Sequence, residues 1–255
     1  MIVTFEYRNK KFCSNLANPI DLSIPMKEGS NTVNAWYVDD LKIEPVRNEH
    51  FLGSVAEGGN VNFRNIFFNP HGHGTHTECV GHIDQQVHSI NDVFERHFFT
   101  AELVTIQPEI WASDDEWRSA GDHVILERQL DAVLKKEPEA LIIRTIPNPE
   151  SKARFRYSNT NPPYMCDTAA KAIREAGIQH LLIDLPSVDR EKDGGKMLAH
   201  KAFWNYPDAP ELKSTITELI YVPDQVKDGK YLLEMQVAAF VNDAAPSRPV
   251  IYEIE

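Results

Sequence analysis

Cysteine, basic residues and long apolar runs are all scarce in this sequence, and each shortage excludes a class of protein. Three cysteines in 255 residues are too few and too scattered for a disulfide framework, so we expect a reducing, cytoplasmic setting. No apolar run approaches the roughly 18–20 residues that cross a bilayer, and the first residues do not form a signal peptide, so we expect no membrane partner. The 26 Lys and Arg are outnumbered by 38 Asp and Glu, and the net charge of −12 disfavours a nucleic-acid partner.

The rest of the composition is that of a folded globular protein. Hydrophobic residues make up 42% of the chain and charged residues 25%, and the length supports a hydrophobic core without disulfides. No internal repeat or clear linker divides the sequence. We therefore expect residues 1–255 to form a single domain, with an additional hairpin at about residues 1–15.

The hydrophobic pattern predicts an α/β fold that is rich in strands. Residues 140–146 are almost continuously apolar, as in a strand buried on both faces. A helix at 168–176, with Asp167 as N-cap and Gly177 as stop, leads to a strand at 181–185, and this order predicts a parallel βαβ unit. Further expected elements are strands at 61–68 and 103–106, a helix at 125–136 and a turn at 245–247.

Histidine is the residue type with the most uneven distribution. Four of the ten histidines lie within residues 71–82, where the average of ten in 255 predicts about 0.5. Imidazoles and carboxylates are the usual protein ligands of zinc and the neighbouring first-row metals. The carboxylate of Glu78 lies among these histidines in the sequence. On a strand, His76 and Glu78 would point to the same side, with His82 further along that face and His71 returning from the preceding turn. We therefore expect a metal site in this segment, whose three glycines argue against a helix.

Around this cluster the sequence resembles the cyclase-like metal-dependent hydrolases, a family that includes bacterial kynurenine formamidase and isatin hydrolase. The family pattern is His-x-Gly-Thr-His-x-Asp-x-Pro-x-His, and Gly74-Thr75-His76, an acid two residues later, and His82 match it in register. The stretch Asp184–Asp189 is similar to the family's Asp-x-x-Ser-x-Asp motif. The resemblance covers roughly residues 20–254.

The sequence departs from the family pattern in three ways. Glu78 stands where the family has Asp, and Val80 stands where it has Pro. His71 lies five residues before His76 and His73 lies three before it, where the family spacing is four. We take His71 as the equivalent ligand and keep His73 as the alternative.

The resemblance implies a fold, an assembly and an activity. The implied fold is an α/β domain with a strand-rich, barrel-like core flanked by helices, of the swivelling β/β/α type, in a dimer or tetramer. The implied activity is hydrolysis of a carbon–nitrogen bond in a small amide, formamide or lactam, with one or two divalent ions, zinc or alternatively manganese. His200 matches a later family histidine and is the implied general acid or base. The implied metal ligands are His71, His76, Glu78, His82 and Glu218.

Physical chemistry supports a hydrolytic role for such a site, and two other roles stay open. A metal with an open position lowers the pKa of bound water from about 15.7 to near 7, which supplies a nucleophile at neutral pH. A metal-dependent lyase or cyclase, in which His200 abstracts a proton, would use the same residues. A binding protein without catalysis would instead close the metal off with protein ligands.

Overall fold

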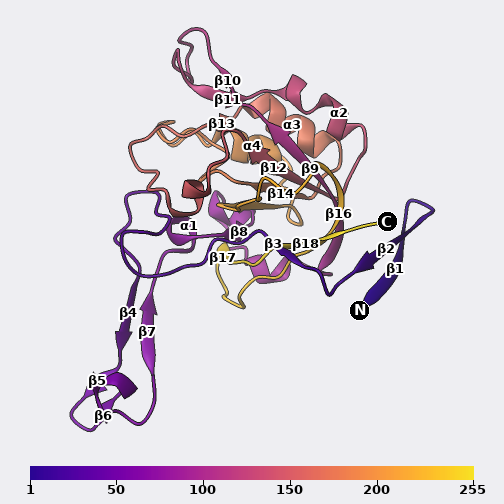
Figure 1. Ribbon diagram of the computed structural model, residues 1–255. Coiled ribbons are helices and arrows are strands. Elements are labelled where there is room, and N and C mark those ends of the chain that lie inside the picture. Colours follow the sequence, from indigo (N-terminus) through magenta and orange to yellow (C-terminus); the bar gives the residue numbers. More distant parts are fainter.

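The centre of the protein is a nine-stranded mixed sheet that curls into a half-barrel (Figure 1). The structure is a computed structural model and describes residues 1–255. In spatial order its strands are β17 (Ala244–Pro246), β8 (His76–Glu78), β15 (Thr215–Glu218), β14 (His180–Ile183), β12 (Ala140–Thr145), β9 (Phe98–Ile106), β16 (Gly229–Glu234), β18 (Val250–Glu253) and β3 (Ile20–Asp21). The four strands from β15 to β9 run parallel, and every other neighbouring pair is antiparallel. The α/β class with a strand-rich, barrel-like core is confirmed.

Both faces of the central strands are covered, which explains why their sequence is continuously apolar. On β12, Leu141 and Ile143 belong to a cluster of 23 buried hydrophobic residues on one face. Ala140 and Ile142, which alternate with them, belong to a second cluster of 14 on the other face. β12 pairs in parallel with β14, and a helix at residues 167–175 connects them, so the predicted unit of strand, helix and parallel strand is present.

Three of the four α-helices lie together on one face of the sheet (Figure 1). They are α2 (Asp131–Leu134), α3 (Asp167–Glu175) and α4 (Leu198–Trp204). α3 begins one residue earlier than predicted: Cys166 is the extended N-cap residue, and the Asp167 carboxylate accepts a hydrogen bond from Arg118 instead. Gly177 follows the helix with φ +77°, a conformation that favours glycine. No helix is long and apolar enough to span a membrane.

Two sequence predictions on local structure are wrong, because distant strands compete with local preferences. The helix expected at 125–136 is confined to a 3₁₀ turn at 127–129 and α2, since Val124 and Ile125 pair in parallel with Tyr164 and Met165. This pairing forms a small sheet of β10 (Glu109–Ile110), β11 (His123–Ile125) and β13 (Tyr164–Met165). The turn expected at 245–247 lies largely within strand β17, which pairs with β8.

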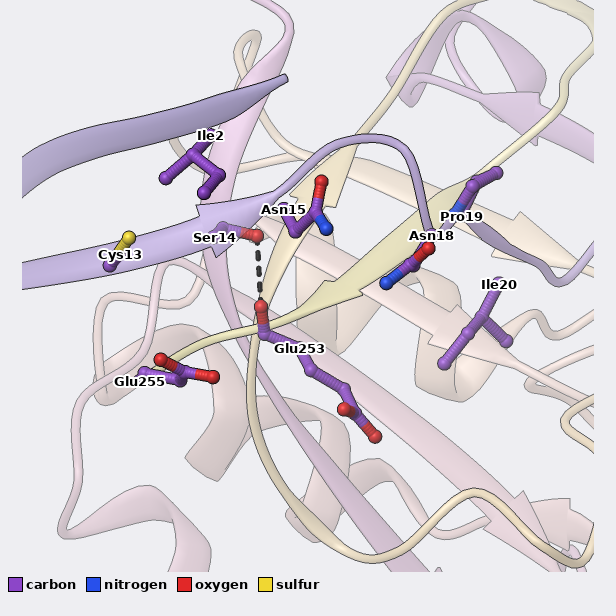
Figure 2. Close-up of a pocket in the computed structure, with 9 residues that line it drawn as sticks. All are labelled: Ile2, Cys13, Ser14, Asn15, Asn18, Pro19, Ile20, Glu253 and Glu255. Carbon is purple, nitrogen blue, oxygen red and sulfur yellow. Dashed lines mark hydrogen bonds between the residues drawn. The ribbon is translucent and has the colours of Figure 1, made fainter.

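An antiparallel hairpin of β1 (Ile2–Tyr7) and β2 (Lys10–Asn15) attaches to the sheet next to the end of β18, where Ser14 pairs with Ile254. Figure 2 shows the Ser14 hydroxyl donating a hydrogen bond to the backbone oxygen of Glu253, at 2.8 Å. A cavity of about 470 Å³ lies between hairpin and edge, and none of the clustered histidines lines it.

A ribbon of residues 42–67, here called the arm, projects away from the body of the protein (Figure 1). Its stem pairs β4 (Lys42–Pro45) with β7 (Arg64–Phe67), and its tip holds a second hairpin of β5 (Arg47–Asn48) and β6 (Phe51–Leu52). The strand predicted at 61–68 is therefore present as β7 but shorter, and all its residues are exposed.

His180 is a buried histidine whose environment keeps it neutral. Its ring lies between those of Phe94 and Phe99, with centroid distances of 5.5 and 4.1 Å, and its Nδ1 shares a hydrogen bond with Thr215. Burial, with a further contribution from Arg96 and against an opposing one from Glu139, lowers its pKa from 6.5 to about 3. Folding therefore releases a proton from this residue between about pH 3 and pH 6.5.

We expect His180→Asn to flatten the acid dependence of stability. In the wild type, the contribution of neutral His180 is complete above pH 6.5 and falls by about 1.4 kcal/mol per pH unit below it. The wild type therefore loses roughly 2 kcal/mol from this group between pH 6.5 and pH 5, and the variant does not. Urea unfolding at several pH values measures the difference. His50→Asn, at an exposed histidine, is the control, and equal slopes for both variants would contradict the prediction.

Candidate metal centre

The histidine segment begins with a single helical turn, α1 (Pro70–His73), where the glycines led us to expect none. Pro70 suits the first helical position, and the Asn69 side chain accepts the backbone N–H of His71 at 2.9 Å. Gly72 is needed here because a Cβ atom would lie 2.6 Å from Cγ2 of Val38. The turn directs His71 back toward β8, as the sequence predicted.

Strand β8 lies between β15 and β17, and this pairing brings distant carboxylates to the histidines. Glu218 on β15 lies directly opposite His76, and Ala244 on β17 lies opposite Glu78. Opposed residues point to the same side of an antiparallel pair, so Glu218 and His76 face one another. After β8 the chain forms a 3₁₀ turn at 80–82, which places His82 beside the cluster rather than along the strand.

Four buried side chains form the inner part of the site. His76 Nε2 lies 3.4 Å from Glu218 Oε2, and His200 Nε2 lies 3.0 Å from Glu78 Oε1 and 3.8 Å from Glu218 Oε1. None of these side chains is more than 4% exposed. Glu218 is fixed by the backbone N–H of Val188, which donates to Oε1 at 3.0 Å.

Asp189 positions His200. Its carboxylate accepts the backbone N–H groups of Ala199 and His200 at the start of α4, and it lies 2.5 Å from Nδ1 of the His200 ring. Burial lowers the pKa of His200, but hydrogen bonding to Asp189 and Glu78 outweighs it and raises the pKa well above its usual value. A histidine whose second ring nitrogen donates to a carboxylate is typical of metal ligands. The sequence motif contained Asp189, but no role was assigned to it.

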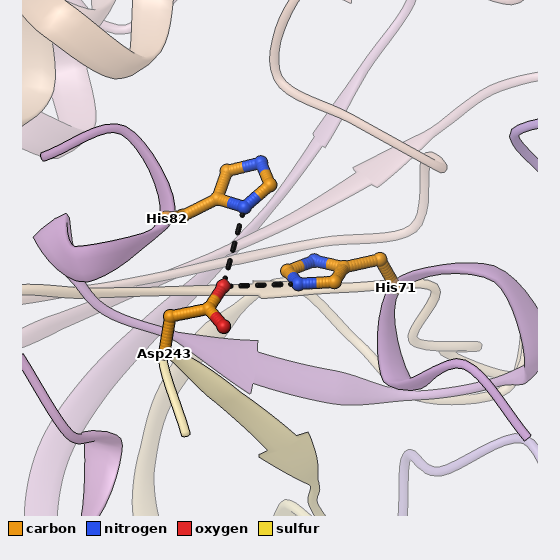
Figure 3. A group of neighbouring side chains, drawn as sticks. All are labelled: His71, His82 and Asp243. Carbon is orange, nitrogen blue, oxygen red and sulfur yellow. Dashed lines mark hydrogen bonds and ion pairs between the residues drawn. The ribbon is translucent and has the colours of Figure 1, made fainter. Parts of the chain in front are cut away.

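Figure 3 shows the outer part of the site, where Asp243 joins His71 and His82. One oxygen of Asp243, Oδ2, lies 3.1 Å from His71 Nε2 and 3.3 Å from His82 Nδ1. These side chains are 20–28% exposed, so they form the solvent-facing side of the group. Asp243 was missed by sequence reasoning, since no motif marks it. It reaches the site because its backbone oxygen accepts Cys79 N–H where β17 joins β8.

All six side chains predicted from the sequence are brought together. They are His71, His76, Glu78, His82, His200 and Glu218. His73, the alternative to His71, lies outside the group: its Nε2 contacts the backbone oxygen of Asp39 at 2.7 Å, and its Nδ1 accepts the N–H of Asn69. Cys79 is buried beside them, and burial raises the pKa of its thiol to about 11.

Two carboxylates of the site, those of Glu78 and Asp243, are held in the ionised form by the histidines around them. Burial lowers the pKa of His71, but hydrogen bonding to Asp243 and the charge of Glu78 raise it to about 10. Hydrogen bonds from His71 and His82 hold the pKa of Asp243 well below its usual range. Burial opposes ionisation of Glu78, yet the charge of His82 and a hydrogen bond from His200 hold its pKa low. The centre therefore presents negative charge that protons or a cation must balance.

The donor set fits a divalent metal ion. His76 Nε2 and Glu78 Oε2 are buried and have no hydrogen-bond partner, although Glu218 and His71 lie near them. Buried polar atoms without a partner are rare, and an ion among them would satisfy both. Three overlapping groups have ligand atoms within 4.8 Å of one another, and imidazole with carboxylate suits zinc and manganese. They are His71–His82–Asp243, His71–His76–Glu78 and Glu78–His82–His200.

Solved structures share this fold at low sequence identity. An isatin hydrolase bound to the product analogue thioisatinate superposes with a TM-score of 0.67 at 11% identity, covering 93% of this chain and 92% of that one. Isatin hydrolase A from Labrenzia aggregata, bound to benzyl benzoate, gives 0.63 at 13%, with 92% and 93% covered. A protein described as a predicted metal-dependent hydrolase from Bacillus stearothermophilus gives 0.61 at 16%, with 92% and 98% covered.

Sequence comparison identifies the family more directly than these structures do. A comparison with curated protein sequences gives no significant match. The family model described as "Putative cyclase" matches residues 20–190, which is two thirds of the chain and includes the whole histidine segment. The protein therefore belongs to the cyclase family.

Proposed function

We propose that this protein is a metal-dependent hydrolase that cleaves a carbon–nitrogen bond in a small amide, formamide or lactam. The observation that carries the proposal is the group of four histidines and two carboxylates, joined by Glu218, with two unpartnered buried atoms, His76 Nε2 and Glu78 Oε2. Membership of the cyclase family and a fold shared with an isatin hydrolase support the same reaction class.

The buried donors His76, Glu78, Glu218 and His200 would hold the ion, with His71 completing the set from the outer side. Such an ion, zinc or alternatively manganese, activates water at neutral pH and polarises a carbonyl group. The role of the protein is to fix these donors on strands β8 and β15, and to hold the His200 ring through Asp189.

Proton transfer requires a group with access to the substrate. The sequence resemblance assigned this role to His200, whose side chain is only 2% exposed and engages carboxylates through both ring nitrogens. The His82 side chain, which the resemblance implied as a metal ligand, is 28% exposed and lies beside Asp243 on the solvent-facing side of the group. We therefore assign to His82 the transfer of a proton from water to the leaving nitrogen, with Asp243 holding the ring.

The proposed reaction is tested by metal analysis together with turnover in ¹⁸O-labelled water. We expect one or two ions per chain, and one labelled oxygen in the product of an N-formyl amide, a lactam or an isatin-like ring. Removal of the ion with a chelator is expected to abolish turnover, and zinc or manganese is expected to restore it. Turnover without label would indicate a lyase or cyclase, and bound metal without turnover of any of these compounds would indicate a binding protein. Either result would contradict the proposal.

Two variants separate the roles of His82 and His200. We expect His200→Asn to weaken metal binding by at least about tenfold, since it removes a buried donor. We expect His82→Asn to keep its metal and to lose about 10²–10⁴-fold in kcat. Metal content and kcat are measured on both, with His50→Asn as the control. The reverse result would assign proton transfer to His200, as the sequence resemblance predicted.

A further inference from the structure

We propose that residues 188–191, here called the hub, hold the donors of the metal centre in place from outside it, with Arg190 and Glu191 as positioning residues. This inference deepens the proposed function and rests on it, because it concerns the residues that hold the proposed metal ligands. Neither Arg190 nor Glu191 belongs to the donor set, and no sequence motif marks either of them. Their role follows from what the other two hub residues contact.

The first half of the hub contacts two buried donors directly. The backbone N–H of Val188 donates to Glu218 Oε1 at 3.0 Å, and the Asp189 carboxylate contacts Nδ1 of His200. The backbone oxygen of Val188 accepts the N–H of Met165, on β13, at 2.8 Å. A shift of this short stretch of chain would therefore move two donors together, and metal sites tolerate displacements of only about 0.5 Å.

Arg190 joins the hub to Asp122, which directly precedes β11 in the small sheet. Its Nε and Nη2 lie 2.9 and 3.4 Å from the two oxygens of Asp122, and Nη2 also donates to Ser119 Oγ at 3.0 Å. The Tyr164 hydroxyl donates to the same carboxylate at 2.8 Å. Burial opposes ionisation of Asp122, but the Ser119 N–H and the other donors around it lower its pKa below the usual value. The guanidinium therefore pairs with a carboxylate that stays charged.

Glu191 joins the hub to a second loop, at residues 159–161. Its carboxylate accepts the backbone N–H groups of Asn159 and Asn161 and, at 2.6 Å, the Tyr37 hydroxyl. Both asparagines have positive φ, +65° and +47°, so the carboxylate stabilises a turn that few non-glycine residues adopt. The Asn161 side chain donates to Asp122 at 2.9 Å, so the two attachments of the hub are also joined to each other.

The ion pair of Arg190 and Asp122 is suited to fixing one arrangement of the chain. The Asp122 side chain is 2% exposed and that of Arg190 20%. At such burial, desolvation offsets much of the Coulomb energy of a pair, so its contribution to stability is small and its geometry is its main effect. Because Arg190 follows Asp189 directly, this geometry sets where Asp189 meets the His200 ring.

The affinity for zinc alone tests the proposal without reference to turnover. We expect Arg190→Met to raise the Kd for zinc at least about tenfold, the usual effect of losing a residue that orients a metal ligand. Arg190→Lys keeps the charge without the planar fork and is expected to lie between the two. Arg118→Met is the matched control and is expected to bind zinc like the wild type, because Arg118 is 14% exposed and pairs with Asp115 and Asp167 instead. Circular dichroism checks that each variant is folded.

A double variant tests whether Arg190 and Asp122 act as one unit. We expect Asp122→Asn to weaken zinc binding by a factor similar to that of Arg190→Met. Combining the two substitutions is expected to weaken it no further, because members of one hydrogen-bonded network are not additive. Fully additive effects would overturn the proposed unit.

The His200 ring of the metal-free protein gives a readout that depends on neither metal nor turnover. We expect its Nδ1 proton, held by Asp189, to exchange with water at least about tenfold faster in Arg190→Met than in the wild type. Nitrogen-15 NMR measures this exchange, and the resonance is assigned by its absence from His200→Asn. Unchanged exchange, or equal zinc affinity in Arg190→Met and Arg118→Met, would overturn the proposal. A wild type that binds no zinc would contradict the proposed function, and the exchange of this proton would still decide for or against the hub.

Discussion

A His76→Ala variant is expected to lose its bound metal and its hydrolytic activity together. His76 is fully buried, and its Nε2 is one of two buried atoms within the site that have no hydrogen-bond partner. Removing it takes away a proposed ligand at the centre of the donor set, opposite Glu218. We expect kcat/KM to fall by about 10³-fold, the order of effect of losing a group that stabilises developing charge.

Metal content by mass spectrometry and kcat/KM on the same preparation measure this effect. His50→Ala, at a histidine whose side chain is 86% exposed and distant from the cluster in sequence, is the matched control and should be unchanged in both. His76→Gln keeps most of the side-chain volume, so it separates loss of a ligand from loss of packing. Full activity in metal-stripped His76→Ala would refute the proposed mechanism.

A second large effect is expected on stability, at an ion pair away from the metal centre. Asp184, at the end of β14, is fully buried, and burial raises its pKa while Lys152 opposes this. Lys152 Nζ donates to the Asp184 carboxylate at 2.7 Å and to both oxygens of Thr145 at 2.7 and 2.8 Å. The ammonium group thus fixes the 150–154 turn to the ends of β12 and β14.

We expect Lys152→Met to lower the free energy of unfolding by about 3–5 kcal/mol, because it leaves a buried carboxylate without its cation. For a chain of this length, that corresponds to a fall in Tm of roughly 10 °C. Lys171→Met removes an exposed pair with Glu175 and is expected to change stability by less than about 1 kcal/mol. Adding Asp184→Asn to Lys152→Met removes the unpaired charge and should recover part of the loss. Thermal unfolding measures all three, and a Tm within 2 °C of the wild type for Lys152→Met would contradict the prediction.

The parts of the fold that could be predicted from sequence are those whose signal is local. Residues 140–145 are buried on both faces and could belong only to a central strand, and Gly177 marks the end of α3 within one residue. The helix expected at 125–136 was wrong because Val124 and Ile125 find a strand partner about 40 residues later. A pattern of apolar residues does not show which distant segment will pair with it.

In the site, too, the residues with a local sequence signal could be predicted, and those brought in by distant strands could not. His71, His76, Glu78 and His82 are close in sequence, so their chemistry was visible as a cluster. Glu218 and His200 were found only through the family resemblance, because nothing in their immediate sequence marks them. Asp243 is neither close to the cluster in sequence nor part of a family motif. It reaches His71 only because β17 pairs with β8, in a segment where the sequence predicts a turn.

The position of β8 between β15 and β17 has a consequence for how the protein matures. The Asp243 carboxylate and His71 are separated by 172 residues, and His200 and Glu78 by 122, so no local folding nucleus contains the donor set. The donors become neighbours only when β8 has paired with β15 and β17, which lie far along the chain from it. An ion bound here would therefore stabilise the finished fold and not the folding intermediates that lack the assembled donor set. Its effect should appear in slower unfolding rather than in faster folding.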